Sequence, residues 1–370
     1  MADEKVSDQV IFDDQDTKQM DSYEDGVLYP DKMPDEVDIK EKKFSVFEWL
    51  RKLKKKQLIL EPEFQRNLAW TKEQKSRFIE SILLYLPLPP LYVNQNTEGK
   101  FIIVDGLQRT TTLADFLKDD GFALSNLQIL RHLNGYVFKE LSPKLRTRIE
   151  DKNLLVYMIK PTVPLPMVYD IFNRINTGGT QLTRQEIRNC LFSGRATQLL
   201  KELSEEPYFR KAIDNGISPK RMKDREAILR YLAFRILGYH LYRKKNMDEF
   251  LNQALKEINK MNESQIGLLK QDFERVMTYT YAFWGEENFR LPTQRTRGRI
   301  NIALLEAVGY FFAIKSNEFL QNNQKVIQRN YKKLLKEDRF IQAVRSSTND
   351  PKKVSARFEL VQEILGDVRC

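Results

Sequence analysis

A five-residue polar run carries the side chains best suited to chemistry, Asp105-Gly106-Leu107-Gln108-Arg109. The β-branched and aromatic residues 101–104 before it predict a buried strand, and the helical spacing of apolar residues in 110–117 predicts a helix after it. A junction of this kind offers a phosphate group unpaired backbone N–H groups and the positive end of a helix dipole. The run therefore predicts phosphate chemistry.

Each polar residue of the run suits one task at a phosphate. Gly106 lets the backbone approach a ligand, and Arg109 supplies a planar cationic fork. Asp105 would hold Mg²⁺ directly or through water, and Gln108 would orient an attacking water. These groups suffice for phosphoryl transfer, which depends mainly on positioning and charge stabilisation. The alternative is a tight turn in which Asp105 and Arg109 pair with each other.

Two other loops carry polar residues that a hydrophobic core does not require. Further candidates for binding phosphate or nucleotide, from these loops and from the helix start, are Gln65, Arg66, Thr110, Thr111, Asn173, Arg174 and Asn176. Gln65 is a second candidate for orienting the water, and a helix C-cap formed with Gly178 explains Asn176 equally well. No Walker A sequence occurs, so a P-loop is excluded as the source of an NTPase activity.

The composition indicates a globular protein of two domains. The chain has 370 residues, 41% of them hydrophobic, which is enough for two ordinary cores. Two cysteines and two histidines exclude a disulfide framework and disfavour both zinc and histidine-dependent nuclease sites. No apolar run approaches the ~20 residues that span a bilayer, and the N-terminus lacks signal-peptide features. We therefore expect a cytoplasmic protein with no zinc and no membrane partner.

The net charge of +10 is unevenly distributed. Residues 1–40 hold thirteen Asp and Glu against four Lys, a net of −9, so residues 41–370 carry +19. A body this basic is expected to attract nucleic acid, because phosphate contacts dominate nonspecific affinity. The candidate DNA contacts are Arg290, Arg295, Arg297 and Arg299, although capping of neighbouring helices explains these arginines equally well. The acidic segment predicts disorder; it would compete with nucleic acid for the basic surface or serve as a solubilising tail.

The apolar pattern divides the chain into two parts. Strands are expected at 58–60, 91–93, 101–104 and 154–159, with a further hairpin at 127–138 around Asn134-Gly135. Helices are expected at 44–56 with Phe44, Phe47 and Leu50 inward, at 71–86 behind a Thr71/Gln74 capping box, from Ser142, and at 164–176. From residue 182 only helical patterns recur, near 183–193, 224–242, 247–260, 263–284, 300–315, 322–336 and 353–366. The prediction is an α+β fold: an acidic tail over 1–40, a domain with a small mixed sheet over 41–195, and an all-helical domain over 196–370.

Four ordered segments resemble the N-terminal domain family of GmrSD-type modification-dependent restriction endonucleases, a branch of the ParB/sulfiredoxin-like superfamily. They are Glu63-Phe64-Gln65-Arg66 with Trp70, the Pro87-Leu88-Pro89-Pro90 stretch, the Asp-Gly-X-Gln-Arg box at 105–109, and Phe172-Asn173-Arg174-Ile175-Asn176 running through Gly178-Gly179 to Thr183 and Glu186. Later segments, Arg221-Met222-Lys223-Asp224 with Arg230 and the run from Arg297 to Asn301, resemble the helical extension of this family. One position departs from the pattern, because Leu107 stands where glutamine is common.

The resemblance implies a ParB-like domain that binds and hydrolyses nucleoside triphosphate through the box at 105–109, with Mg²⁺, in a bacterial restriction or anti-phage defence system. It also implies DNA as a partner, phage or modified DNA included, and a partner nuclease or other defence-system subunit. Many relatives append an HNH nuclease domain, but the helical half of this chain lacks the histidines for one, which disfavours HNH cleavage. Three activities stay open: an NTPase, a metal-dependent DNA nuclease or nickase using the same pocket, and a non-enzymatic DNA-binding adaptor.

Overall fold

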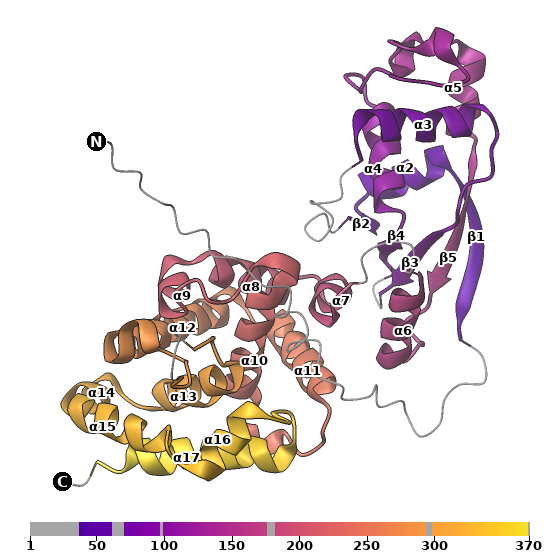
Figure 1. Ribbon diagram of the computed structural model, residues 1–370. Helices are drawn as coiled ribbons and strands as arrows, with labels where there is room; N and C mark the ends of the chain where they lie inside the picture. The colour runs from indigo at the N-terminus through magenta and orange to yellow at the C-terminus, as the bar shows by residue number, and fades with distance from the viewer. Residues whose placement is uncertain (1–36, 61–69, 97–98, 176–181, 294–297, 369–370) are drawn as a thin grey trace, which may run out of the picture. The chain divides into compact units, whose positions relative to one another are not determined.

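The computed structural model describes residues 37–60, 70–96, 99–175, 182–293 and 298–368 (Figure 1). The chain divides into two compact units. The α/β unit holds the described residues within 37–230 and 252–274, and the helical unit holds those within 231–251 and 275–368. Among the described helices, none combines the length and apolar character that crossing a membrane requires.

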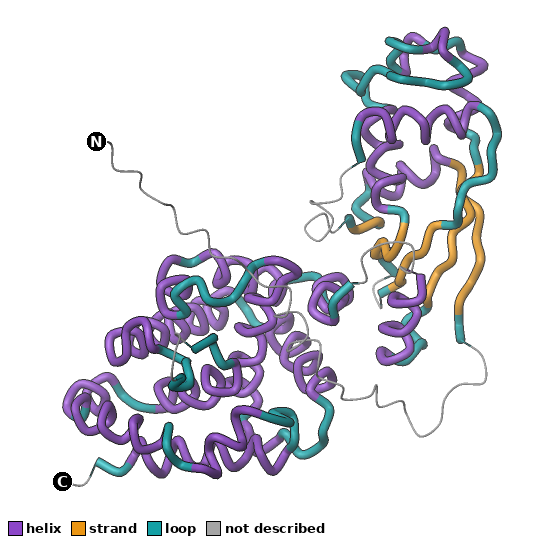
Figure 2. The backbone as a smooth tube through the Cα atoms, in the orientation of Figure 1, coloured by secondary structure: helices purple, strands orange, loops and turns teal. Residues whose placement is uncertain are grey.

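A mixed five-stranded sheet forms the centre of the α/β unit (Figure 2). Its strands are β1 (Ile39–Ser45), β2 (Leu58–Ile59), β3 (Leu91–Gln95), β4 (Phe101–Asp105) and β5 (Asn153–Ile159), in the spatial order β1-β5-β3-β4-β2. The pairs β1/β5 and β3/β4 are antiparallel, whereas β3/β5 and β2/β4 are parallel. The small mixed sheet predicted from the sequence is therefore confirmed.

Helices cover both faces of this sheet. One face packs against α2 (Val46–Lys54), α3 (Lys72–Leu83), α4 (Leu107–Phe116) and α5 (Pro143–Glu150), in a core that includes Ile103. The other face packs against α6 (Leu165–Ile175) and α7 (Arg184–Leu191), in a second core that includes Val104. Successive side chains of a strand point to opposite faces, so these two neighbours on β4 enter different cores. The unit continues with α8 (Arg195–Glu205), α9 (Pro207–Ala212) and a 3₁₀ turn at Lys220–Met222.

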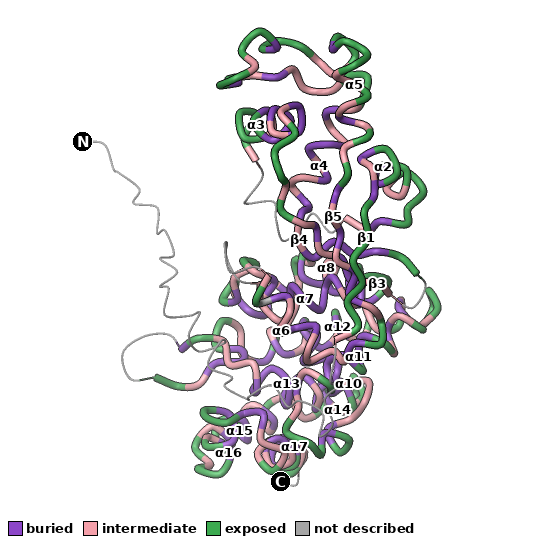
Figure 3. Tube along the Cα trace, turned by 90° about the vertical axis from the view of Figure 1, so that its right-hand side faces the viewer, coloured by how far each residue is buried: buried purple, intermediate pink, exposed green. Residues whose placement is uncertain are grey.

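The first helix begins later than the sequence pattern predicts. Residues 39–45 form β1, which is exposed over most of its length (Figure 3), and α2 starts only after Ser45. The Ser45 hydroxyl accepts a bond from the Glu48 N–H at 3.1 Å, and the Glu48 carboxylate accepts one from the Ser45 N–H at 3.0 Å. This capping box sets the start of the helix. The buried face changes accordingly: Trp49 is fully buried, and Phe47, which was expected inside, is 59% exposed.

The predicted hairpin at 127–138 is wrong. This segment forms a loop with short 3₁₀ turns at Arg131–Leu133 and Phe138–Glu140. The carboxylate of Glu80, on α3, accepts bonds from the backbone N–H groups of residues 128, 129 and 130 at 3.3, 2.9 and 2.8 Å. A side chain from a distant helix therefore takes the donors that strand pairing would have used.

The carboxylate of Glu80 makes this loop sensitive to pH. Burial opposes its ionisation, but the backbone donors of Leu130, Ile129 and Gln128 outweigh burial and lower the pKa of Glu80. A carboxyl group whose pKa is lowered by folding stabilises the fold above its unfolded pKa of about 4.3, and this stabilisation is lost as pH falls through the folded pKa.

We expect Glu80→Ala to lower the free energy of unfolding by about 2–3 kcal/mol at pH 7, because three backbone N–H groups lose their charged acceptor. The difference from wild type should shrink as pH falls below about 4, where the wild-type carboxylate is itself being protonated. Chemical denaturation of both proteins at pH 7 and in acid measures it. An equal difference at both pH values would contradict the role of the ionised carboxylate.

The rest of the chain is helical, as predicted. Its helices are α10 (Lys223–Leu237), α11 (Met247–Lys260), α12 (Glu263–Trp284), α13 (Ile302–Ile314), α14 (Asn317–Asn322), α15 (Gln324–Leu334), α16 (Asp338–Arg345) and α17 (Pro351–Gly366), with 3₁₀ turns at Tyr239–Leu241 and Gly285–Glu287. Four helices have no counterpart in the sequence prediction: α8, α9, α14 and α16. Their short length, between 6 and 11 residues, gives a periodic pattern little room to repeat.

Candidate functional site

The polar run lies where strand β4 ends and helix α4 begins, as predicted. Asp105 is the last residue of β4, and Gly106 is the N-cap of α4 with φ +98°. A Cβ atom added to Gly106 would lie 2.1 Å from Cδ2 of Leu91 and 3.3 Å from an amino nitrogen of Arg109. Both the backbone conformation and the space around it therefore require glycine.

A β-bulge next to this junction changes the direction of Asp105. Val93 on β3 lies opposite Ile103 on β4, but the preceding residue, Tyr92, lies opposite Asp105, so Val104 is an extra residue in β4. A bulge of this kind bends the strand and re-aims the side chains beside it. The carboxylate of Asp105 is 39% exposed at this position.

The bulge places Asp105 at one end of a row of polar side chains that crosses the sheet. Tyr92 lies opposite Tyr157 of β5, and Tyr157 lies opposite Glu41 of β1. The two tyrosine rings stack with their centroids 5.3 Å apart, and Glu41 raises the pKa of Tyr157 through its nearby charge. Sequence reasoning did not find the tyrosines, because only strand register brings them beside Asp105.

Arg109 is held by three acceptors. Its guanidinium pairs with the Asp105 carboxylate at 2.7 Å and donates to the carbonyl of Pro90 at 3.1 Å and to that of Pro89. Burial lowers the pKa of Arg109, while the negative charge of Asp105 opposes that change. The pairing of Asp105 with Arg109, the structural alternative of the sequence prediction, is thus present. A guanidinium has five N–H donors, so these contacts leave donors for a ligand.

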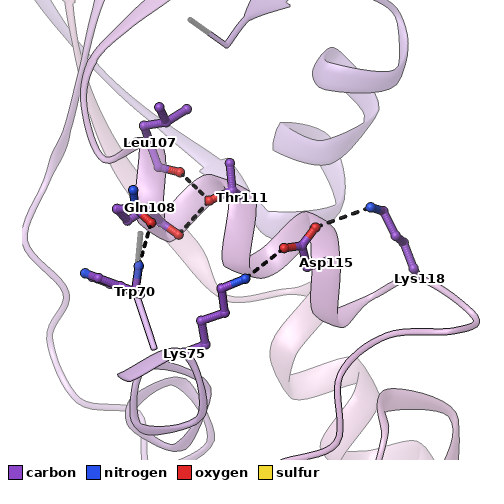
Figure 4. A network of polar contacts seen from close by, with 7 residues as sticks. All are labelled: Trp70, Lys75, Leu107, Gln108, Thr111, Asp115 and Lys118. Atoms are coloured by element: carbon purple, nitrogen blue, oxygen red, sulfur yellow. Dashed lines mark hydrogen bonds and ion pairs between the residues drawn. The ribbon is translucent and has the colours of Figure 1, made fainter. Parts of the chain in front are cut away.

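Gln108 and Thr111 are fixed at the first turn of α4 (Figure 4). The side-chain oxygen of Gln108 accepts a bond from the backbone N–H of Trp70 at 3.2 Å. The hydroxyl of Thr111 donates to the carbonyls of Leu107 and Gln108, at 3.0 and 3.1 Å. The amide nitrogen of Gln108 is the group that remains for a water or a phosphate oxygen.

Thr110 faces the core rather than a ligand. Its side chain is fully buried, and its hydroxyl accepts a bond from the indole N–H of Trp49 at 3.1 Å. The hydroxyls of both Thr110 and Thr111 are therefore engaged within the fold rather than directed at a phosphate.

The other predicted phosphate-binding residues are only partly described. Gln65, Arg66 and Asn176 lie outside the described residues. Asn173 belongs to α6, and Arg174, one position later, is exposed and pairs with Asp170 at 2.9 Å. Among these candidates, the side-chain contact that the structure describes is that of Arg174 with Asp170, not with the box at 105–109.

A second polar cluster joins two of the segments that carried the family resemblance. Thr183 caps α7, and its backbone N–H donates to the carboxylate of Glu186 at 2.6 Å. Arg221 reaches this cap twice, because its carbonyl accepts from the Thr183 hydroxyl at 3.3 Å and its guanidinium lies 3.6 Å from Glu186. The Thr-X-X-Glu spacing is a capping-box signal that could have been recognised in the sequence. Ile187 of α7 packs in the same core as Val104, which links this cluster to β4.

The predicted DNA-contacting arginines are placed differently from one another. Arg290 is 7% exposed, and its guanidinium donates to the carbonyl of Glu286 at 3.0 Å and to that of Gly298. It therefore holds its own loop together, and this placement does not suit a DNA contact. Arg299 is exposed, and Arg295 and Arg297 lie outside the described residues.

The described residues contain no group of three or more His, Cys, Asp or Glu side chains arranged to hold a metal ion. Asp105 alone therefore does not form a complete metal-binding site. Magnesium commonly binds through one or two carboxylates together with substrate phosphates. The donor set at the junction suits a Mg²⁺ ion that arrives with a phosphorylated ligand.

Comparison with known proteins identifies one family. Residues 46–193 match the family model described as GmrSD restriction endonuclease, N-terminal domain. The matched segment runs from α2 to just beyond α7, and so contains both the box at 105–109 and the capped start of α7. No curated protein matches the chain. The family match confirms the resemblance over this segment and supports a restriction-related, DNA-associated protein.

Proposed function

We propose, from the membership of residues 46–193 in the GmrSD restriction endonuclease N-terminal domain family, that this protein binds and hydrolyses a nucleoside triphosphate. The site is the junction of β4 and α4. The protein acts in association with DNA, as part of a restriction or anti-phage defence system.

The start of α4 is the observation that carries this proposal. Its N-cap is Gly106, and no side chain caps its first turn, whereas α2, α3 and α7 all begin with a side-chain capping box. The first N–H groups of a helix have no partner within the helix, and the helix dipole makes this end positive. Together with Arg109 beside it, this arrangement suits an anionic phosphate.

Three side chains divide the chemistry between them. Arg109, already positioned by Asp105, contributes charge-assisted hydrogen bonds to phosphate oxygens as negative charge develops. Asp105 would hold a Mg²⁺ ion that binds with the phosphorylated ligand. Gln108 directs its amide toward the attacking water. The protein supplies positioning and electrostatic stabilisation, which is most of what phosphoryl transfer requires.

We expect Asp105→Asn to lower the rate of NTP hydrolysis by about 100-fold or more, because the amide keeps the hydrogen bond to Arg109 but loses the charge that holds Mg²⁺. The measurement is phosphate release from each of the four NTPs with Mg²⁺, with and without DNA. Asp115→Asn is the matched control, since it makes the same change on α4 at a residue that pairs with Lys75 and Lys118. It should retain the wild-type rate.

The same assay separates the alternatives. A wild-type protein that hydrolyses none of the four NTPs, with or without DNA, refutes the proposal. Nicking of plasmid DNA without any NTP, abolished by Asp105→Asn, would indicate a nuclease that uses this site. Salt-sensitive DNA binding without hydrolysis, and unchanged by Asp105→Asn, would indicate a non-enzymatic adaptor.

A further inference from the structure

An open pocket of about 570 Å³ lies at the C-terminal end of α3, beside α5, in the α/β unit. It is lined by Tyr85, Lys144, Thr147, Arg148, Asp151, Lys152 and Asn153. Three of these residues are cations and one is a carboxylate, so the lining carries a net charge of +2. None of them belongs to the box at 105–109, and the proposed NTP site therefore does not account for this pocket.

Tyr85 occupies a backbone position that favours glycine. Its φ is +58°, and it follows α3 as the left-handed residue of a Schellman turn. The turn is closed by the bond from the Leu86 N–H to the Ser81 carbonyl at 2.9 Å and from the Tyr85 N–H to the Ile82 carbonyl at 3.0 Å. A left-handed conformation is unfavourable for a non-glycine residue, because its Cβ atom approaches the following carbonyl oxygen. A non-glycine residue in this conformation suggests that its side chain has a function that offsets the unfavourable backbone.

The ring of Tyr85 is exposed but held in place. It is 62% exposed, although large aromatic side chains usually lie inside. The guanidinium of Arg148 lies 4.5 Å from the ring centroid and the ammonium of Lys152 lies 6.0 Å from it. Both cations are anchored near the end of α3, since Arg148 donates to the Leu83 carbonyl at 2.9 Å and Lys152 to the Leu86 carbonyl at 3.0 Å.

Capping of α3 by the two cations explains only part of this arrangement. The Nε atom of Arg148 is buried and has no hydrogen-bond partner among the described residues. Lys144, one turn earlier on α5, is exposed and also lines the pocket. Arg148 and Lys144 both line the pocket and lie about 6 Å apart along the helix axis, and two cations at this spacing suit an anion with several oxygens.

We propose that this pocket binds a nucleotide of a DNA strand, with its base stacked on Tyr85 and its phosphates paired with Lys144, Arg148 and Lys152. Proteins that bind single-stranded nucleic acid combine an aromatic stacking surface with cations that follow the backbone, and the pocket offers both. Cations spaced along α5 suit consecutive phosphates of a strand. The inference rests on the proposed function for its choice of DNA as the partner.

The test is binding of a fluorescein-labelled single-stranded deoxyoligonucleotide to the full chain, measured by anisotropy at several salt concentrations. Tyr85→Gly should weaken binding at least about fivefold, since a stacked base contributes ~1–3 kcal/mol. The same variant should unfold at an equal or higher temperature, because glycine is preferred at this turn position. Tyr85→Phe keeps the ring and should bind like wild type.

Lysine variants test whether the cations of the pocket pair with DNA phosphates. Lys144→Gln should reduce the salt slope of binding by about 0.7, as expected for the loss of one phosphate contact on a single strand. Lys55→Gln is the matched control, because it removes the same charge from another exposed lysine of the α/β unit and should leave the slope unchanged. Equal effects of the two variants would show that Lys144 attracts DNA only through its charge and not as part of a binding pocket, which would overturn the proposal.

Two further results would overturn it. Wild-type affinity of Tyr85→Gly would show that the ring stacks no base. Displacement of the oligonucleotide by deoxyadenosine monophosphate at comparable affinity would show that the pocket takes a free nucleotide rather than a strand. NTP hydrolysis measured on the same wild-type preparation keeps the two ideas distinguishable: DNA binding that depends on Tyr85 in a protein without NTPase activity supports the pocket and refutes only the proposed NTPase.

Discussion

Replacing Arg357 with methionine is expected to lower the free energy of unfolding of the helical unit by about 3–5 kcal/mol. Arg357, on α17, pairs with Glu306 on α13, and both side chains are fully buried. Its guanidinium also donates to the carbonyl of Thr348. Removing the cation leaves the carboxylate of Glu306 as a buried charge without this partner, and desolvation of such a charge is costly.

A double variant distinguishes the destabilisation caused by leaving one charge unpaired from the stabilisation that the intact ion pair provides. Arg357→Met combined with Glu306→Leu should recover much of the loss, because apolar residues of similar volume often replace a buried ion pair at little cost. Lys260→Met is the matched control, since it removes the cation of the exposed Lys260–Glu257 pair and should cost less than about 0.5 kcal/mol. Chemical denaturation measures all three. A loss below about 1 kcal/mol for Arg357→Met would contradict the prediction.

Replacing Gly106 with alanine is expected to destabilise the α/β unit by about 2–5 kcal/mol and to abolish NTP hydrolysis. The left-handed backbone contributes roughly 1–2 kcal/mol of this cost, and overpacking contributes about 1–3 kcal/mol. The new methyl group would lie 2.1 Å from the buried side chain of Leu91, so either Leu91 or the start of α4 must move. Movement of α4 displaces Gln108 and Arg109 from the junction.

Gly135→Ala provides the control for this prediction. Gly135 also has a positive φ, +91°, but no atom lies within 4 Å of a Cβ atom added there. It should therefore show only the conformational cost of about 1–2 kcal/mol and hydrolyse NTP at the wild-type rate. Thermal denaturation and phosphate release measure both variants. Equal destabilisation of the two would show that contact with Leu91 contributes nothing.

The elements nearest the candidate site were predictable, because their signals are local. The run 101–104 with Gly106 after it predicted a strand and a helix, and β4 and α4 meet as expected. The Thr71/Gln74 capping box is present at the start of α3, with bonds of 2.9 and 3.3 Å. Such signals depend on residues within a few positions of each other, so tertiary packing rarely overrides them.

The errors arose where a distant group decided the local conformation. Asn134-Gly135 is a strong hairpin signal, but the carboxylate of Glu80 takes the backbone donors of 128–130. Arg290 looked like a surface cation, but it is buried against the carbonyl groups of its own loop. Neither partner is visible in the pattern of neighbouring residues.

By itself, the sequence determined that a glycine-containing polar box follows a buried strand and opens a helix, and that residues 46–193 match the model of a restriction endonuclease N-terminal domain. Only the tertiary structure shows which groups the charged side chains of the box contact. It pairs Asp105 with Arg109, joins Arg109 to the carbonyls of Pro89 and Pro90, and sets Tyr92 opposite Asp105 through a bulge. The physical reason is that local patterns depend on backbone geometry over a few residues, whereas the positions of Tyr92, Pro89 and Pro90 relative to the box depend on how β3 pairs with β4.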